Sequence, residues 1–284
     1  MTAGVRHAAA PAATRREERD WNAIWAVVRK DVTAVRRSKA VVIPMLAVPF
    51  LLLVVLPLVI GLAARAQTGG IEEFLSDMPA GLADPISSLP PAQQIVVLVN
   101  GYLLAPLFLI VPLMVSAVLA ADAFAGEKER RTMETLLHLP ISNRDLFVAK
   151  LLGAYIPAVV VSWVGFALFC VVTNAVAWGV MHRIFVPTRL WAVVIFWVAP
   201  AVALLGLGVM VRVSVRARST QEANQLGGAV VLPLIFLAVG QSTGLLLLDL
   251  PVAVAIGAVV WVLAIWLTAR GARRFTRDQI ATRI

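Results

Sequence analysis

Six long segments without a charged residue constrain the fold of this chain most strongly, because such segments must leave water. A helix needs about 20 apolar residues to cross roughly 30 Å of hydrocarbon, and a helix pairs all backbone polar groups within itself. The composition agrees, since 60% of residues are hydrophobic, 14% are charged and the mean hydropathy is +0.88. We therefore expect an all-α membrane protein whose six spans occupy a domain at 40–269, at about 40–64, 95–121, 151–181, 190–211, 226–248 and 252–269.

The distribution of Lys and Arg predicts the orientation of these spans. Of the 25 basic residues, all but Arg65, Arg183 and Arg189 precede the first span, follow the sixth, or lie in the second-to-third and fourth-to-fifth connections. Because cytoplasmic loops carry the excess of Lys and Arg, we expect both termini to be cytoplasmic. The net charge of +9 is then explained by membrane topology, and no nucleic-acid partner is expected.

The residues before the first span divide into two parts. Residues 1–14 are small and unpatterned, which predicts a disordered cytoplasmic tail, and residues 270–284 form a basic tail at the other end. Within 15–39, Trp21, Ile24, Trp25 and Val28 recur at helical spacing with basic residues on the other side. This pattern predicts an interfacial amphipathic helix that contacts membrane lipids, with packing against a partner protein as the alternative.

A dense polar stretch, GEKERRTMETLLHLPISNRDLFVAK at 126–150, separates the second and third spans. Its nine charged residues include Glu127 and Arg131 at i, i+4 spacing, but such a pair stabilises a helix by only about 0.2 to 0.5 kcal/mol. After the apolar residues Leu136 and Leu137, Pro140 ends the helix. Stability of the helix itself therefore does not account for these charges.

A second helix is predicted to start directly after this proline. Ser142 with Asp145 three residues later is typical of an N-cap pair, and Ile141 is placed to pack on Leu146. The sequence thus predicts a cytoplasmic hairpin between spans two and three, apolar on one strip and charged on the other. Such a hairpin suits docking into a groove of a cytoplasmic partner.

At these residues the chain resembles the type 2 ATP-binding cassette permeases, which are membrane subunits of bacterial exporters. The residues that match their motif are Gly126, Glu127, Glu129, Thr132, Glu134, Leu136, Leu137, Pro140 and Ser142. Arg131 stands where that family usually has glycine, which makes this copy less flexible there. The resemblance implies a coupling helix at 126–142 that inserts into an ATPase subunit, with contacts from Glu127, Glu129, Arg130, Thr132, Glu134, Leu136, Leu137 and Pro140.

The same resemblance implies that ATP hydrolysis takes place on another chain. No G-x-x-x-x-G-K-[ST] loop is present to hold phosphates, so we expect this chain not to be an enzyme and to bind no cofactor or metal. ATP and Mg would be held by a cytoplasmic ATPase partner. A second permease copy or a paralogue would complete the cargo path in the bacterial cytoplasmic membrane.

Candidate residues for the cargo path are the few polar side chains inside the spans: Asn100, Asn174, Gln241, Ser242 and Thr243. The small residues of the Gly240–Gly244 stretch give close helix packing as an equally open explanation. No span interior carries an acidic or basic residue, which favours an amphipathic or apolar cargo over a cation bound by a carboxylate. The sequence does not identify the cargo among drugs, lipids, peptides and sodium.

Two other classes of function share parts of this pattern. A non-transporting scaffold or signalling subunit of an ATPase complex would have the same hairpin and topology. A membrane enzyme would need a catalytic cluster, yet His7, His138 and His182 are scattered and Cys170 lies alone in the third span. Movement of a cargo on ATP hydrolysis distinguishes the exporter from the scaffold.

Overall fold

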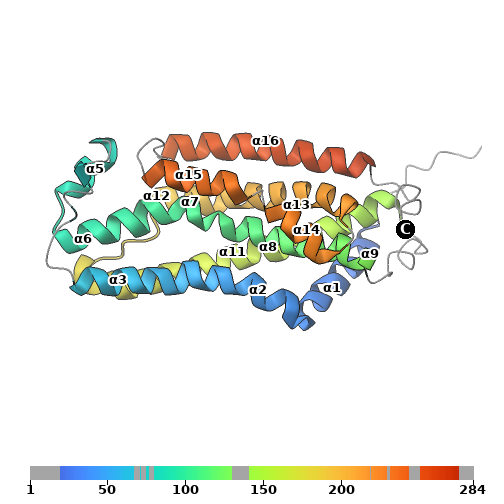
Figure 1. Cartoon of the computed structure of the whole chain (residues 1–284), viewed down its shortest axis with the longest axis horizontal. Helices are drawn as coiled ribbons and strands as arrows, with labels where there is room; N and C mark the ends of the chain where they lie inside the picture. The colour runs from blue at the N-terminus through green and yellow to red at the C-terminus, as the bar shows by residue number, and fades with distance from the viewer. Residues whose placement is uncertain are drawn as a thin grey trace, which may run out of the picture.

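The computed structural model describes residues 20–66, 71, 75–76, 80–129, 141–217, 219–228, 231–242 and 250–274. Within these ranges every regular element is a helix, and the helices form an elongated bundle (Figure 1). Among the described residues, five helices are long and apolar enough to cross a membrane: Val41–Ala66, Pro91–Gly126, Asn143–Met181, Arg189–Ser214 and Leu250–Ala272. The predicted all-α membrane class is therefore confirmed, while a sixth span is not.

The first span is preceded by a separate helix that turns away from it. Helix α1 (Trp21–Arg37) begins with Asp20 as N-cap, whose carboxylate accepts a hydrogen bond from Ala23 N at 3.0 Å. The chain leaves the helical conformation at Ser38, where φ is −91° and ψ is 97°. The first span then follows as α2 (Lys39–Phe50), η1 (Leu51–Val55) and α3 (Leu56–Ala66). The corner between α1 and α2 is visible in Figure 1. The predicted helix within 15–39 is present, and its membrane-interface location stays a prediction.

The second and third spans flank the polar stretch. A short helix, α5 (Ala80–Ser87), precedes the second span, which consists of α6 (Pro91–Val96), η2 (Val97–Leu103), α7 (Leu104–Phe108), α8 (Ile110–Ala121), η3 (Asp122–Gly126) and α9 (Glu127–Glu129). The third is the single helix α11 (Asn143–Met181) of 39 residues. At 1.5 Å per residue α11 is about 58 Å long, nearly twice the hydrocarbon thickness. The helix is therefore longer than the hydrocarbon layer requires.

The fourth span packs between the second span and the last span. The fourth comprises α12 (Arg189–Val193), η4 (Val194–Val198) and α13 (Ala199–Arg216), and the last is α16 (Leu250–Arg274). Helix α13 contacts both α8 and α16 along its length. The contact with α8 is so close that a Cβ added at Gly206 would lie 2.6 Å from Ser116 Oγ. A side chain at position 206 would push these two helices apart.

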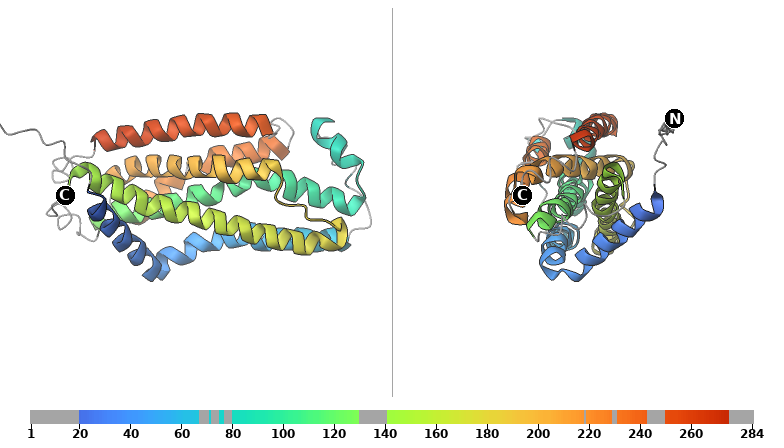
Figure 2. Two further views of the ribbon diagram at one scale, coloured as in Figure 1. Left: turned by 180° about the vertical axis from the view of Figure 1, so that it is seen from behind. Right: turned by 90° about the vertical axis from the view of Figure 1, so that its right-hand side faces the viewer.

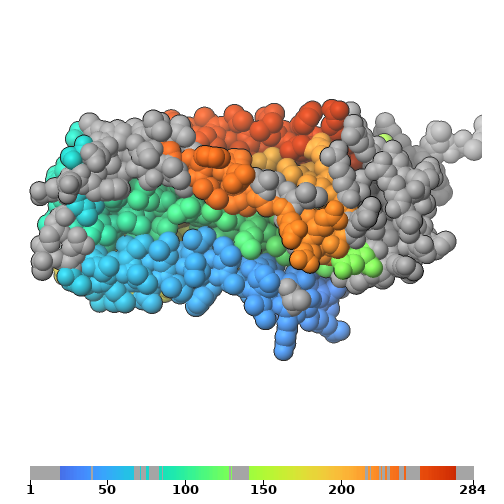
Figure 3. All heavy atoms as spheres, viewed as in Figure 1, coloured from blue at the N-terminus to red at the C-terminus, as the bar shows by residue number. Residues whose placement is uncertain are grey.

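The segment expected to be a continuous fifth span, 226–248, is divided in the structure. Its described residues belong to α14 (Thr220–Gly228) and α15 (Leu232–Ser242), which lie one after the other along the bundle (Figure 1). Helix α14 contacts α8, whereas α15 contacts α7 and η2. Atoms of both helices reach the bundle surface, α15 beside α16 and α14 nearer α9 (Figure 3). Helix α14 ends at Gly228 and Pro233 is the second residue of α15, and glycine and proline are the residues that least favour a helix interior.

The two ends of the bundle differ in what they carry. Helix α9, the start of α1 and the end of α16 lie at one end, and α5 lies at the other (Figures 1 and 2). This arrangement agrees with termini that share a side of the membrane. The expected tails at 1–14 and 270–284 fall wholly or mostly outside the described residues.

Cysteine labelling tests the predicted sidedness. In a Cys170→Ala background, we expect Ala80→Cys to react with a membrane-impermeant maleimide from outside intact cells. We expect Arg218→Cys to react only after the inner face is exposed, because the basic connections are predicted to be cytoplasmic. The reverse labelling pattern would invert the topology.

Candidate functional site

The predicted coupling segment is described at its two flanks. Helix α9 contains Glu127 and Glu129, and the chain resumes at Ile141 and Ser142 before α11. The central candidates lie outside the described residues: Arg130, Thr132, Glu134, Leu136, Leu137 and Pro140. Their contacts with an ATPase stay predictions. The geometry described below is therefore that of the two flanks.

Glu127, on the first flank, is buried and paired with Lys150 of α11. The Lys150 side chain is 0% exposed, and its ammonium donates hydrogen bonds to Glu127 Oε2 and, at 2.9 Å, to Ala123 O. The Nζ atom also lies 5.8 Å from the ring centroid of Phe124, within the range of a cation–π contact. A buried ammonium costs several kcal/mol unless it is paired, so Lys150 depends on Glu127.

Two residues of α1 extend this pair into a four-residue charge cluster, made of Lys30, Asp31, Glu127 and Lys150. Lys30 Nζ lies 3.1 Å from Glu127 Oε1 and 3.0 Å from Asp31 Oδ1. The cluster holds two positive and two negative charges and joins α1, α9 and α11. The Lys30 side chain is 51% exposed, in contrast to Lys150.

The pKa of Lys30 is raised above its ordinary value of 10.5. Burial opposes the charged form, but the carboxylates of Asp31 and Glu127 together outweigh it. A raised folded-state pKa contributes stability that is fully present below the unfolded pKa, about 10.4, and is lost as pH rises through the folded value. Lys30 therefore stays charged at neutral pH and does not make the cluster a switch near neutrality.

Apolar contacts on both sides of the charge cluster hold α1 against the start of α11. Ile24 and Val28 of α1 are buried together with Ile141, Leu146 and Ala149. Ser142 Oγ accepts a hydrogen bond from Asp145 N at 3.1 Å and donates one to Asp145 Oδ2 at 2.9 Å. The predicted N-cap pair is confirmed, and the burial of Ile141 with Leu146 agrees with the predicted packing.

Glu129 connects the same flank to helix α14. Its Oε2 accepts hydrogen bonds from Thr220 N and Thr220 Oγ1, each at 3.0 Å. Thr220 begins α14, and a carboxylate is favoured beside the free N–H groups at a helix N-terminus. Thus the two acidic residues of α9 contact three other helices: α1, α11 and α14.

Sequence reasoning assigned Glu127 and Glu129 to the ATPase contact and did not anticipate these internal partners. Lys30 and Glu127 are 97 positions apart, and Glu129 and Thr220 are 91 apart. Pairing rules read from sequence reach only three or four residues along a helix. One usable signal was Lys150, a basic residue placed directly at the start of an apolar run.

The side-chain amide of Asn174, a candidate for the cargo path, hydrogen-bonds the connection that follows α11. Its Oδ1 accepts hydrogen bonds from Phe185 N at 2.8 Å and Val186 N at 3.2 Å, while Nδ2 donates to Val186 O at 2.7 Å. These three bonds hold an irregular backbone segment that would otherwise leave polar groups unpaired. The structure therefore gives Asn174 a structural task, and its place in a cargo path stays a prediction.

Asn100 is buried deeper in the bundle, with 1% of its surface exposed. Its Oδ1 has no hydrogen-bond partner within the described residues, and its main-chain O accepts a bond from Trp191 Nε1 at 3.0 Å. The contacts of the other candidates are not described, because the side chains of Gln241 and Ser242, and all of Thr243, fall outside what the structure describes. The proposed path residues are thus not brought together here.

Aromatic side chains fill the interior next to Asn100. Trp191 is fully buried, with ring centroids 4.7 Å from Phe169, 5.4 Å from Phe166 and 5.6 Å from Phe108. These rings come from α7, α11 and α12 and pack in stacked, tilted and edge-to-face arrangements. The centre of this part of the bundle is a packed core.

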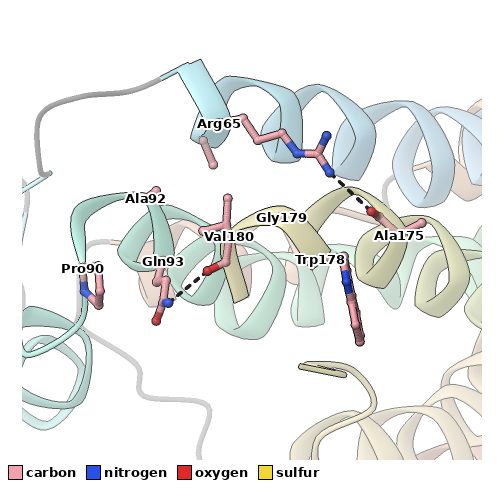
Figure 4. A pocket seen from close by; sticks show the side chains of 9 residues that line it. Arg65, Pro90, Ala92, Gln93, Ala175, Trp178, Gly179 and Val180 are labelled. Carbon is pink, nitrogen blue, oxygen red and sulfur yellow. Dashed lines mark hydrogen bonds between the residues drawn. The ribbon is translucent and has the colours of Figure 1, made fainter. Parts of the chain in front are cut away.

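A cleft of about 620 Å³ lies at the opposite end of the bundle, between α3, α6 and the end of α11 (Figure 4). Arg65 donates to Val176 O at 2.9 Å and to Ala175 O at 3.4 Å, and Gln93 Nε2 donates to Val180 O at 3.0 Å. Val180 O lies in the last turn of α11, where carbonyls lack intrahelical donors, so Gln93 supplies one. These side chains therefore hold α3 and α6 to the end of α11.

Comparison with known families gives one match over most of the chain. Residues 25–270 match the family described as ABC-2 family transporter protein. The matched range begins inside α1, ends inside α16 and includes the whole charge cluster. A search of curated proteins finds no match.

Proposed function

This chain belongs to the ABC-2 transporter family, and we propose that it is the membrane permease subunit of an ATP-driven exporter. The permease forms the cargo path as a dimer and couples to a separate cytoplasmic ATPase through 126–142. The family gives the membrane transporter class. Direction, dimerisation and coupling are the parts that we propose.

The charge cluster is the observation that carries the coupling proposal. A segment that transmits force needs firm attachment to the spans at both ends, since a loose segment would absorb the displacement. Residue 127 is attached through Lys150 and Lys30, and the far flank is attached through the apolar packing of Ile141 and Leu146. Residues 130–140 therefore lie between two anchored points.

The energy required of the ATPase is considerable. Moving a gate from 1:99 to 99:1 takes about 5.5 kcal/mol of differential binding. A buried, fully paired link such as Lys150 with Glu127 resists breaking by a comparable amount. In the proposed coupling, this link joins movement of the segment to α9 and α11.

Packing of the single chain supports a path shared between two copies. The aromatic core around Trp191 occupies the interior between α7, α11 and α12. Large apolar side chains are exposed along several spans, among them Phe50, Trp163, Val171, Val262 and Trp266. Lipid covers part of this surface, and a second copy covers the remainder in the proposed dimer.

Reconstitution tests the proposed function directly. We expect the chain to co-purify with a P-loop ATPase encoded beside it, and proteoliposomes with both subunits to move a cargo only when ATP is hydrolysed. The matched control carries the ATPase with its P-loop lysine replaced, which should bind the permease without transport. Stable association and hydrolysis without movement of any cargo would favour the scaffold or signalling alternative.

A further inference from the structure

Two arginine side chains lie beside the ring of one tryptophan, Trp266 of α16. The guanidinium carbon of Arg212, in α13, is 5.6 Å from the centroid of this ring, and that of Arg270, in α16, is 5.3 Å from it. Both distances fall within the roughly 6 Å of a cation–π contact. Arg212 Nη2 also donates a hydrogen bond to Leu267 O at 3.2 Å. Arg212, Trp266 and Arg270 thus form an arginine–tryptophan cluster with two positive charges.

Close packing of α13 on α16 fixes the position of the arginine–tryptophan cluster. A Cβ added at Gly208, about one turn before Arg212, would lie 3.0 Å from Leu267 Cβ and 3.3 Å from Thr268 Oγ1. Neither α13 nor α16 contains an acidic residue. Two cations near one ring repel each other, and neither of their own helices supplies a carboxylate to offset the repulsion. The cluster therefore favours an anionic ligand.

The face of α16 next to this cluster is apolar and exposed. Helix α16 lies along the outside of the bundle (Figure 2) and is the least buried of the five long apolar helices in the described part of the chain. Val259 and Val262 precede Trp266 at helical spacing, and the three side chains are 60%, 68% and 54% exposed. Arg270 follows on the same side, about one turn after Trp266. One face of α16 thus changes from apolar to aromatic to basic towards its C-terminal end.

We propose that the arginine–tryptophan cluster binds the phosphate of an anionic phospholipid whose acyl chains lie along Val259 and Val262. Guanidinium groups suit this ligand because they form bidentate hydrogen bonds with phosphate oxygens. The apolar strip beside the two charges favours a lipid over a free phosphate ion, which has no apolar part to cover that strip. An anionic headgroup is preferred over a zwitterionic one, because both arginines repel the ammonium group of the latter.

The predicted topology assigns this lipid to the cytoplasmic leaflet. The basic end of α16 is predicted to be cytoplasmic, and tryptophan is enriched where spans cross the membrane–water boundary. Basic sites between spans on the cytoplasmic side attract anionic headgroups. The bound lipid would hold the ends of α13 and α16 at the membrane surface. This inference goes beyond the proposed function, since it requires neither an ATPase nor transport.

Fluorescence quenching in bilayers measures the expected lipid preference. Val262→Cys, in a Cys170→Ala background, carries a bimane label on the exposed apolar strip, and the full-length permease is reconstituted into phosphatidylcholine vesicles. Phosphatidylglycerol with a nitroxide on its acyl chain is then added in increasing amounts to quench the label. We expect half-maximal quenching at a mole fraction roughly tenfold lower than for phosphatidylcholine that carries the same nitroxide.

Removal of single charges separates this site from a general attraction of lipid to basic residues. Arg270 is exposed, so Arg270→Gln should leave the fold intact and raise the half-maximal fraction of phosphatidylglycerol roughly fivefold, the effect of one basic residue at an anionic surface. Arg212→Gln/Arg270→Gln should abolish the preference for phosphatidylglycerol. Arg183→Gln/Arg189→Gln removes two charges from exposed positions near the connection that follows α11 and, as the matched control, should leave the quenching curve unchanged.

Each result supports or refutes the lipid site. Equal quenching by the two nitroxide lipids, or an unchanged curve with Arg270→Gln, would refute it. Loss of the phosphatidylglycerol preference on addition of inorganic phosphate would assign the cluster to a free phosphate ion instead. A label that neither lipid quenches would show that a second copy of the chain, and not lipid, covers this face of α16. The expected preference, measured in the permease alone, would stand even if the proposed exporter function failed.

Discussion

Replacing Glu127 with leucine is expected to destabilise the folded chain by about 3 to 5 kcal/mol, the usual cost of removing one partner from a buried ion pair. Among the described residues, Lys150 would then retain the Ala123 carbonyl as its hydrogen-bond acceptor and the Phe124 ring as a neighbour, with no exposure to water. Thermal unfolding of the purified permease in detergent measures the loss. Glu129→Leu makes the same chemical change at an exposed side chain two residues away and should cost much less.

A double variant separates the missing charge from other effects of the substitution. Replacing both partners of a buried pair with apolar residues is often neutral or stabilising. We therefore expect Glu127→Leu/Lys150→Met to recover most of the stability lost by Glu127→Leu, since Lys30 can return to water. If the double variant is as unstable as the single one, the packing of Glu127, and not its charge, supports this end of the bundle.

Local sequence rules predicted the helix starts and most of the spans. The Ser142 and Asp145 pair depends on contacts three residues apart, and such contacts do not require knowledge of the fold. The same rules missed the charge cluster because Glu127 has an obvious local partner at i+4, Arg131, while its described partners, Lys30 and Lys150, belong to other helices. Only packing of α1 against α11 brings them within reach.

The fifth expected span shows a different limit. Hydropathy over 226–248 measures only how apolar the segment is. It takes no account of Gly227, Gly228 and Pro233, although glycine and proline are the strongest local signals for the end of a helix. In the structure the two glycines end α14, and Pro233 is the second residue of α15. A similar limit applies to Asn174, because the loop amides it binds at 185 and 186 cannot be inferred from its position in an apolar run.

The largest expected effect on function follows from reversing the charge of Glu134, which lies outside the described residues. If Glu134 contacts the ATPase at a partly desolvated interface, Glu134→Lys should cost at least about 2 to 5 kcal/mol of binding, the range for losing one partner of a buried pair. That corresponds to a loss of affinity of roughly 30-fold or more. The spans should still insert, because an added cytoplasmic Lys agrees with the positive-inside rule.

Co-purification of a tagged ATPase with matched amounts of each permease measures this effect alongside ATP-driven transport. Leu137→Asp tests the apolar strip in the same assay, and Glu72→Lys, in the loop predicted to face outward, controls for the substitution itself. We expect the first two variants to lose both association and transport, and the control to retain both. Because both flanks of 130–140 are anchored, a lost contact there cannot be replaced by movement of the segment. Undiminished association and transport in Glu134→Lys and Leu137→Asp would show that this charged segment serves a purpose other than coupling.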